Sequence, residues 1–586
     1  MTPAGASRSV VIRRALAGLA VAVTLAAGLI VPGLRAVAMH GQITGIVTDA
    51  TTALPLENVC VTLGPPIRCW TATNAVGRYL IDLTAIGPDG QGWDIYFLRT
   101  GYVTQQQTVV VNGPTTKDVV LAREAGVTPP ATVPQPPNLV QQPPAAPPLT
   151  TYTVYLPNVT RMLGGRYGWH TPFIVQNVGS SSARLEVSYY RFSDGSLVAT
   201  RAADVLPGRS FVGSPNDEGD LPADTQFSVV VSAAGSPVVA VVNEHQGQGG
   251  AAEALSYSGF RAGSRTVFLP LVAKMAGGWL TTMIVQNLGT VPTTVTASFT
   301  SLDGSLTSRI ARTVLPLRSQ FIDPRGEPTL LEGVEYAATF TASEPIAVVA
   351  NAHNDLPGTV MPMGDSYNGV PAVTGTTTYA PYVTKNTDGV GRNSRIIVQN
   401  AGVAAATPAL SLQPFGGGAA TRVTGPSVAP GASWSSVPAT ADGEFALTVT
   451  QGTFAVLVTA ISPATAMYYT GTGEPTGKLF MPNVTRSLTS GPPDPGWTTP
   501  ILIQSATATS ATLRWYRFAD GSLVTTQTVM LTVGGTTRID PRSVPGLADG
   551  SQYAVVLETA GRVAAIVTEL NLSGGDSAMI YSGFPE

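Results

Sequence analysis

The sequence is poor in charged residues, histidine and cysteine. Asp, Glu, Lys and Arg make up 12% of the 586 residues, about half of the roughly 25% that is usual in soluble proteins. The formal net charge is −3, and no basic stripe suited to a nucleic acid or acidic tail is present. Four histidines and two cysteines leave few groups for catalysis or metal binding. The composition therefore argues against a nucleic-acid partner.

Long helical patterns are also missing. The chain has 62 Gly and 47 Pro, together with many Val and Thr, which is typical of short strands joined by turns. Hydrophobic residues reach 44%, enough to bury cores. Because 586 residues exceed what one core can organise, we expect an all-β chain of several domains.

One long apolar run stands near the N-terminus. Arg13 and Arg14 precede the run at 15–30, and the small residues Ala36 and Ala38 follow it. This pattern predicts a secretory signal over residues 1–38 that is cleaved after Ala38. An uncleaved anchor is the alternative, although the run is short for a membrane span. We therefore expect a secreted or cell-surface protein with no membrane span after cleavage.

The two cysteines, Cys60 and Cys69, lie close together in the sequence. Between them, Gly64-Pro65-Pro66 can turn two strands back on each other. In an exported chain such a pair predicts a disulfide, and two buried free thiols are the alternative.

Residues 39–123 are expected to form a small β-sandwich of six or seven short strands. Quoted in order, its motifs are "GIVTD" from Gly45, "PLENVCV" from Pro55, "TNAVGRY" from Thr73 and "GY" at Gly101. This order resembles the carboxypeptidase regulatory-like domain, a transthyretin-like sandwich grouped by fold with starch-binding-type sandwiches. The resemblance covers about 80 residues and implies an accessory module, because the stretch lacks the metal-binding His and Glu of a peptidase.

A proline-rich segment follows at 124–150, with nine prolines among residues 127–150. No core can form there, so we expect an extended polyproline II spacer. A ligand for a proline-binding groove is the alternative.

The rest of the chain repeats. Each unit opens with an aromatic residue, one further residue and a proline, at Pro157, Pro270, Pro381 and Pro482. The predicted units are 151–262, 263–374, 375–475 and 476–586. About seven strands in roughly 100 residues predict an immunoglobulin-like sandwich for each unit. The units resemble uncharacterised repeats of bacterial secreted proteins, and joints of about five residues lead us to expect a semi-rigid rod.

A phrase such as "GWHTPFIVQNVG" recurs early in every unit, from Gly168, Gly278, Gly391 and Gly496. Its apolar centre predicts a strand buried on both sides, with Gln tying a loop to the sheet edge and Asn forming a turn. The functional alternative is an exposed aromatic row that stacks on sugars or on a partner, formed by Trp169, Trp279 and Trp497. Arg392 replaces the Trp in the third unit.

Residues with reactive chemistry are scattered. His245 and His353 stand at matching positions, but with His40 and His170 they lack a nucleophile at a fixed spacing. Asp217, Glu218, Asp220 and Asp224 could hold Ca²⁺, although a solvated acidic loop is the preferred interpretation. Residues 471–479 only approximate a phosphate loop, because Leu479 stands where Ser or Thr is needed. We therefore predict no catalytic residues, no cofactor and no metal.

Three functions remain open. The first is a non-catalytic structural or adhesive rod at the cell envelope, which the absence of a repeated reactive site favours. The second is a carbohydrate-binding accessory protein, supported by the fold relatives of the first domain and by the tryptophans. The third is a non-catalytic component of a secreted hydrolase system. The expected partner is accordingly an extracellular polysaccharide or an envelope protein.

Overall fold

The computed structural model describes most of the chain from Gln42 onward. The residues it describes are 42–586 except 53, 64–70, 75–76, 83–91, 112–114, 125–149, 166–167, 247–252, 355–361, 373–374, 388, 390, 490–495 and 572–577. The predicted signal at 1–38 and nearly all of the proline-rich segment therefore lie outside the described residues. The chain divides into two compact units, 1–144 and 145–586. Strands and three short 3-10 helices are its only regular elements within the described ranges, which confirms the all-β class.

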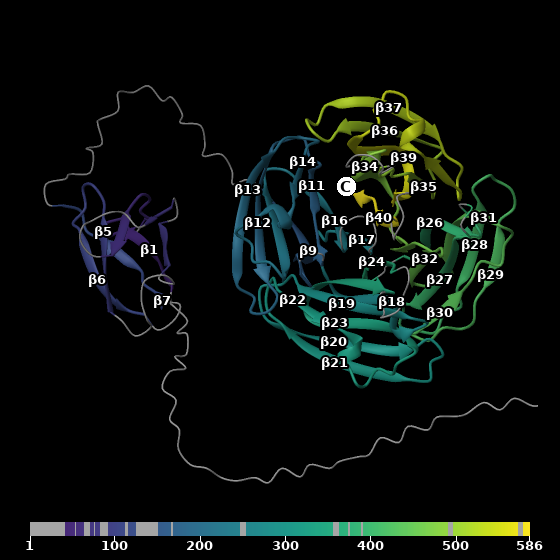
Figure 1. The fold of residues 1–586 in the computed structure, drawn as a ribbon, viewed down its shortest axis with the longest axis horizontal. Helices are drawn as coiled ribbons and strands as arrows, with labels where there is room; N and C mark the ends of the chain where they lie inside the picture. Colours follow the sequence, from purple (N-terminus) through teal and green to yellow (C-terminus); the bar gives the residue numbers. More distant parts are fainter. Residues whose placement is uncertain are drawn as a thin grey trace, which may run out of the picture. The chain divides into compact units, whose positions relative to one another are not determined.

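The first unit is a small β-sandwich (Figure 1). Its strands are β1 (Gln42–Asp49), β2 (Cys60–Leu63), β3 (Thr71–Ala72), β4 (Arg78–Asp82), β5 (Gly92–Leu98), β6 (Gln105–Val110), β7 (Thr115–Thr116) and β8 (Val119–Leu121). One sheet has the order β4-β1-β7 with β8 also paired to β1, and the other has the order β3-β2-β5-β6. On β1, Ile43 and Val47 are fully buried and Ile46 is not. The alternation predicted from the sequence is thus present.

A buried carboxylate holds the end of β1. Asp49 is 1% exposed and accepts hydrogen bonds from the Tyr102 hydroxyl at 2.6 Å, from the Arg123 Nε at 2.9 Å and from the backbone N–H groups of Thr51 and Thr52. These donors, Tyr102 first, keep the pKa of Asp49 well below its usual value. Gly101, with φ of 84°, makes the bend that brings Tyr102 back to the core, since such a backbone angle suits glycine.

Cys60 begins β2 and is disulfide-bonded. Its predicted partner, Cys69, lies outside the described residues.

The second unit contains four sets of strands in the same order, here called repeats one to four. Repeat one has β9 (Thr151–Arg161), β10 (Trp169–His170), β11 (Phe173–Asn177), β12 (Ala183–Arg191), β13 (Leu197–Val205), β14 (Ser210–Gly213), η1 (Pro215–Asp217), β15 (Thr225–Ala234), β16 (Val238–Gln246) and β17 (Ala254–Ser258). Repeat two has β18 (Ser264–Ala276), β19 (Trp279–Asn287), β20 (Thr293–Ser301), β21 (Thr307–Val314), β22 (Ser319–Ile322), η2 (Pro324–Gly326), β23 (Val334–His353), β24 (Gly364–Asn368) and β25 (Val370–Pro371).

Repeats three and four follow the same plan. Repeat three has β26 (Thr378–Lys385), β27 (Asn393–Asn400), β28 (Ala409–Pro414), β29 (Thr421–Thr424), β30 (Ser433–Ser436), β31 (Gly443–Thr450), β32 (Phe454–Ile461) and β33 (Ala466–Thr470). Repeat four has β34 (Thr476–Arg486), β35 (Ile501–Ser505), β36 (Ser510–Arg517), β37 (Leu523–Met530), β38 (Thr536–Ile539), η3 (Pro541–Ser543), β39 (Ser551–Leu570), β40 (Ala578–Ser582) and β41 (Phe584–Pro585).

Each repeat is a sandwich of two sheets. The opening sheet, which contains the first strand of the repeat, has the order β13-β12-β15-β9 in repeat one. The closing sheet, which contains the last long strand, has the order β14-β11-β16-β17. The long strands β23 and β39 belong to both sheets of their repeats. The first half of each strand pairs in the opening sheet, and the second half pairs in the closing sheet. The predicted tandem β-sandwich architecture is confirmed.

The proline that opens each repeat produces a β-bulge in the first strand. In repeat one, Pro157 and Asn158 together lie opposite the single residue Ser228, and the same shift occurs at the other three prolines. Proline cannot donate to the ladder, so an extra residue is accommodated there. The Tyr257 hydroxyl on β17 braces this bulge, because it donates to the Asn158 carbonyl at 2.6 Å and accepts from the Asn158 N–H at 3.1 Å.

The predicted Asp-Gly hairpins join β12 to β13, β20 to β21 and β36 to β37 in repeats one, two and four. Asp194 accepts from the Ser196 N–H at 2.9 Å, and Gly195 has φ of 69°, the backbone angle that such tight turns require. Asp303 and Asp520 make the same contact.

The four repeats close on one another. Strands β17, β24, β33 and β40 meet at the centre (Figure 1), each in contact with the next, and β40 returns to β17. The cavity between them measures only about 10 Å³, too small to hold more than about one water. The rod expected from the short joints is therefore wrong for this unit. A joint of about five residues limits the distance between two sandwiches, but the packing of their surfaces sets their relative orientation.

We expect Tyr257→Phe and Tyr581→Phe each to lower the free energy of unfolding by about 1–3 kcal/mol, because each leaves a buried backbone group at the bulge without its partner. Tyr581 makes the same two contacts with Asn483. Urea denaturation measures the change. Tyr152→Phe is the control, since Tyr152 is 38% exposed, and an equal loss in this variant would contradict the assigned role.

Candidate functional site: the interfaces between the repeats

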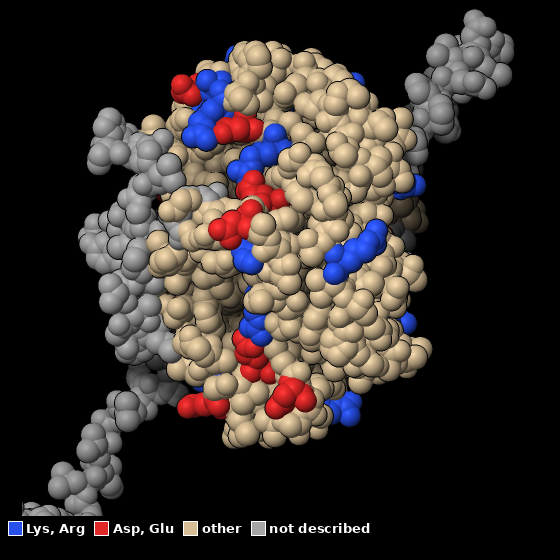
Figure 2. Space-filling model, turned by 90° about the vertical axis from the view of Figure 1, so that its right-hand side faces the viewer, with Lys and Arg blue, Asp and Glu red and all other residues tan. Residues whose placement is uncertain are grey.

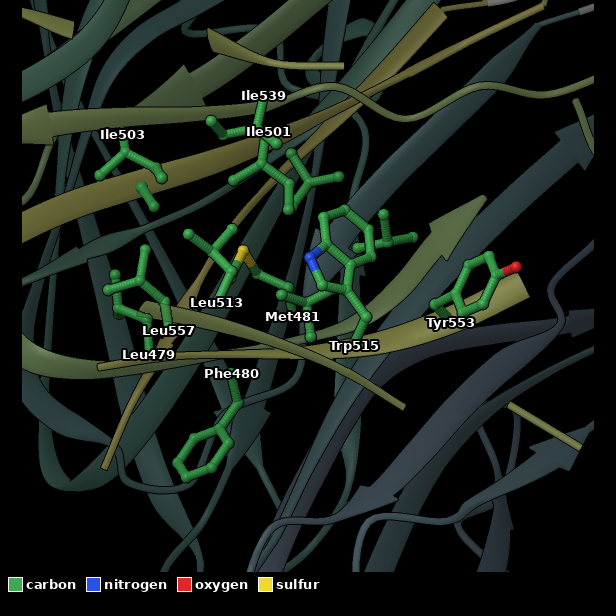
Figure 3. Packing of buried hydrophobic residues seen from close by; sticks show 14 of the residues in the cluster. Leu479, Phe480, Met481, Ile501, Ile503, Leu513, Trp515, Ile539, Tyr553 and Leu557 are labelled. Carbon is green, nitrogen blue, oxygen red and sulfur yellow. The ribbon is translucent and has the colours of Figure 1, made fainter. Parts of the chain in front are cut away.

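The closing sheet of each repeat packs on the opening sheet of the repeat before it. Val349 of repeat two joins the core cluster of repeat one, and Ile397 and Leu457 of repeat three join that of repeat two. The cluster of repeat four, centred on the fully buried Trp515, is completed by residues of repeat one, namely Ile174, Val239 and Val241. In Figure 3, Phe480, which belongs to the same cluster, points to the other side of its strand from Met481 and away from the Trp515 ring. Each repeat thus supplies part of its neighbour's core.

The repeated phrase forms the buried strand that was predicted from its apolar centre. All five residues of β11 and of β35 are buried. The turn predicted for the Asn is present as well: Asn177 Nδ2 donates to the carbonyls of Ser181 and Val205 at 2.7 Å, and its Oδ1 accepts from the Gly179 N–H. Asn287 and Asn400 repeat this pattern.

The Gln of the phrase has a role that the sequence did not reveal. Gln399 donates to the loop carbonyl of Gly431, as predicted, but also to the carbonyl of Ala338 in the preceding repeat at 3.1 Å. Gln504 likewise donates to Leu447 of repeat three at 3.0 Å. In repeats three and four this side chain therefore connects two repeats, whereas Gln286 donates only to Leu317 of its own repeat.

A second polar contact links three of the four opening prolines to the next repeat. The Ser319 hydroxyl donates to the Pro157 carbonyl at 2.8 Å, Ser433 to Pro270 at 2.9 Å, and Thr536 to Pro381 at 2.8 Å. The bulge at these three prolines thus presents a carbonyl that the following repeat binds. Three of the four interfaces share this bond.

Charged and aromatic contacts add to these interfaces. Arg395 of repeat three pairs with Glu335 of repeat two at 2.6 Å, and Arg538 of repeat four pairs with Glu444 of repeat three. Between repeats one and two, the Arg318 guanidinium lies 4.2 Å from the centre of the Tyr190 ring. Between repeats four and one, Arg209 donates to the Ala519 carbonyl at 2.8 Å.

Two buried glutamates lie at the interfaces between repeats one and two and between repeats four and one. Glu244, 2% exposed, accepts from Asn158 Nδ2 of its own repeat at 2.8 Å and from Asn351 Nδ2 of repeat two at 3.2 Å. Glu569 has the same arrangement with Asn483 and with Asn243 of repeat one. Burial raises the pKa of both carboxyls to about 7, against the opposing effect of the amide donors.

The sequence contains a pattern from which these two buried glutamates could have been predicted. The residue after the opening proline is Asn in repeats one and four, Leu in repeat two and Tyr in repeat three. Glu244 and Glu569 occur in the same two repeats, and Ala352 and Ala460 hold the matching positions in the others. The joint occurrence of Asn and Glu within a repeat would have indicated that the two side chains meet.

The predicted aromatic row is not exposed. Trp169, Trp279 and Trp497 are all half-buried, and each meets a ring of the following repeat. The ring centres of Trp169 and His353 lie 5.3 Å apart, those of Trp279 and Tyr468 5.6 Å, and those of Trp497 and His245 6.2 Å. The tryptophans therefore pack between repeats, and their binding of a ligand stays a prediction.

The histidines flagged from the sequence lie at these same interfaces. His245 stacks near His170 with 5.4 Å between ring centres, and burial, together with His170, lowers the pKa of His245 to about 4. His353 Nδ1 lies 2.9 Å from Oε2 of Glu253, which is buried. His40 lies outside the described residues.

The acidic loop holds its carboxylates apart. Glu218 and Asp220 both pair with Arg201, while Asp224 accepts from the Gly164 N–H and Asp217 from the Ser214 hydroxyl. Within the described part of the chain, no group of three or more His, Cys, Asp or Glu is placed to hold a metal ion. Lys478, in the stretch compared with a phosphate loop, pairs instead with Glu586 at 2.6 Å.

The surface drawn in Figure 2 is mostly uncharged, and its basic and acidic side chains stand next to one another. That face shows no patch of a single sign, in keeping with the low net charge. In the ranges that the structure describes, no helix is long and apolar enough to cross a membrane.

No family model matches this chain, and no curated protein matches it. Among solved structures, a variant of BcpA, the major pilin subunit of Bacillus cereus, is 9% identical, with 73% of this chain and 89% of that chain covered and a TM-score of 0.12. The pilus protein RrgB of Streptococcus pneumoniae is also 9% identical, with 75% and 94% covered and a TM-score of 0.12. Likenesses this weak carry no argument about the fold or the function.

We expect Ser319→Ala and Ser433→Ala each to lower the free energy of unfolding by about 1–2 kcal/mol, because each leaves a buried proline carbonyl without its donor. Urea denaturation of the full chain measures the change. Ser210→Ala is the matched control: Ser210 occupies the same position in repeat one, but its buried hydroxyl has no hydrogen-bond partner. A loss in the control equal to that in the other two variants would contradict this account.

Proposed function

We propose that the chain is an exported, non-catalytic structural protein. Its working part is a closed ring of four β-sandwiches, and the N-terminal sandwich is carried on the proline-rich spacer as an accessory module. The ring would act as a scaffold at the cell surface or outside the cell, with an envelope protein or an extracellular polysaccharide as its partner. Residues 1–38 would direct export.

One observation carries this proposal: the residues that recur in the repeats hold the ring together. The opening proline makes the bulge, the closing tyrosine braces it, and the Ser or Thr of the next repeat binds the proline carbonyl. In repeats three and four the Gln of the phrase also donates to the preceding repeat. When a repeated motif maintains contacts between repeats, assembly is the simplest function for it to encode.

The accessory role of the first unit rests on its resemblance to the carboxypeptidase regulatory-like domain. The proposed boundaries are 39–123 for this module, 124–150 for the spacer and 151–262, 263–374, 375–475 and 476–586 for the ring repeats. A disulfide between Cys60 and Cys69 belongs to the same proposal and would fix the turn after β2.

Carbohydrate binding is the second candidate, and a non-catalytic role in a secreted hydrolase system is the third. The candidate ligand-facing residues remain Trp169, Trp279 and Trp497, which are half-buried. Their packing against the next repeat limits a stacking surface, and this favours the structural role.

We expect the mature chain to turn over no peptide, glycoside or ester substrate, because the residues with reactive side chains are engaged in contacts between strands and repeats. A broad activity screen with single Ala replacements at His170, His245 and His353 tests this. Reproducible activity that one replacement abolishes, in a variant that still folds, would overturn the non-catalytic assignment.

The same preparation distinguishes the structural role from carbohydrate binding. A panel of insoluble polysaccharides is incubated with the full chain and with the Trp169→Phe and Trp497→Phe variants. The structural role predicts that both variants are retained on every polymer to the same extent as the full chain. Retention that both variants weaken equally would favour the carbohydrate-binding candidate.

A further inference from the structure

The interface between repeats four and one, here called the seam, differs from the other three. Because these repeats stand at opposite ends of the ring sequence, no short joint connects them. Ser210 and Gln176, which match Ser319 and Gln399 at other interfaces, have buried polar atoms without a hydrogen-bond partner. A cavity of about 440 Å³ lies here, lined among others by Gln176, Pro237, Tyr516 and Glu558. The seam therefore lacks both a covalent joint and the Ser and Gln contacts that are made at other interfaces.

One side-chain to side-chain contact crosses the seam at Glu569. Ser258, Arg261 and Arg209 of repeat one also donate across the seam, each to a backbone carbonyl of repeat four. Asn243 Nδ2 of β16 donates to Glu569 Oε2 of β39 at 2.9 Å, and Asn483 Nδ2 of β34 donates to Glu569 Oε1 at 2.8 Å. Other side chains fix the orientation of both amides, so that each directs its Nδ2 toward Glu569. Ser256 donates to Asn243 Oδ1 at 3.2 Å, and Gln552 donates to Asn483 Oδ1 at 2.7 Å. Glu569 is 2% exposed and thus removed from water in the closed ring.

Among the described residues, the groups that face Glu569 include no cation that could offset its charge. Tyr581 on β40 is the titratable neighbour, and burial keeps its pKa well above the usual value, so it stays neutral. Asn483 on β34 and Asn243 on β16 are uncharged, and the two amides only partly offset the cost of burying a carboxylate. An ionised Glu569 is therefore disfavoured in the closed ring and gains hydration when the seam opens.

We propose that Glu569 is a proton-controlled latch: its neutral form keeps repeats four and one together, and its ionisation lets the ring open at the seam. The sign follows from linkage. In the closed ring the carboxyl has a pKa of about 7, whereas the ordinary value is 4.5. The closed form binds the proton more tightly, so closure is strongest below pH 4.5, weakens as pH rises to about 7 and changes little above it.

Glu244 is the residue of repeat one that matches Glu569, and it serves as an internal comparison. It has the same two Asn donors at the interface between repeats one and two, and it faces His353 and the neutral Tyr257. There, the joint after β17 and the Ser319–Pro157 bond also connect the repeats. Ionisation of Glu244 would loosen this interface without separating the two repeats.

The latch is tested by the labelling rate of a cysteine buried in the seam. Val241→Cys places the thiol among seam residues that are fully buried when the ring is closed. Leu457→Cys is the control, at the matching position between repeats two and three, where Ala352 replaces the glutamate. Rates in the full-length chain are divided by that of a short thiol peptide at each pH, which removes the effect of thiol ionisation. The parent chain reports background labelling.

We expect the protection of Val241→Cys to fall on the order of 50-fold from pH 5 to pH 8, as a closed-form pKa of about 7 implies, with little change in Leu457→Cys. Adding Glu569→Gln should remove this fall, and adding Glu244→Gln should leave it in place. The proposal is overturned if protection of Val241→Cys does not change with pH, if Leu457→Cys loses protection equally, or if the fall persists with Glu569→Gln. Protection of Leu457→Cys in the Glu569→Gln background establishes that this variant folds.

Discussion

The burial of each repeat's core depends on the next repeat. The first strand of a repeat offers one side to its own core and the other to the closing sheet of its neighbour, which inserts residues such as Val349 and Ile397. This requirement is the hydrophobic effect acting between modules. A straight array would leave the last opening sheet uncovered, whereas a ring of four covers it with repeat one. The bulge at the opening proline sets the contact, because it turns a backbone carbonyl toward the neighbour.

Much of the local structure could be predicted from the sequence. The buried strand of the repeated phrase, the Asn turn and the Asp-Gly hairpins follow from nearest-neighbour chemistry that a short window contains. The ring could not be predicted in this way, because the contacts that close it join residues such as Asn243 and Glu569, which are 326 positions apart. The tryptophans illustrate the same limit: their apolar rings fit either an exposed platform or an interface, and only packing decides.

Differences among the repeats matter as much as their likeness. Buried Asn–Glu contacts hold two interfaces. At the other two interfaces, Ala occupies the position of the Glu, and Thr occupies the position of the Asn from the following repeat. The seam combines one such polar contact with unpaired Gln176 and Ser210. Even in a ring of identical repeats the seam would lack a covalent joint, and these substitutions also remove the Gln and Ser contacts made at other interfaces. In the proposed latch, the Asn243–Glu569 contact links closure of the seam to protonation.

The closed ring is tested most directly by a distance across the seam. Residues 207–209 lie against Gly521, where an added Cβ would come within 3.4 Å of the Pro207 carbonyl oxygen, and Leu206 and Leu523 nearby are exposed. Spin labels at these two positions should give a short, narrow distance at pH 5, like that of the matched pair Leu197 and Leu315 between repeats one and two. Two intervening repeats in a rod would separate the labels by roughly 60 Å or more, given strands of about ten residues. A long distance for the seam pair beside a short one for the matched pair would contradict the ring.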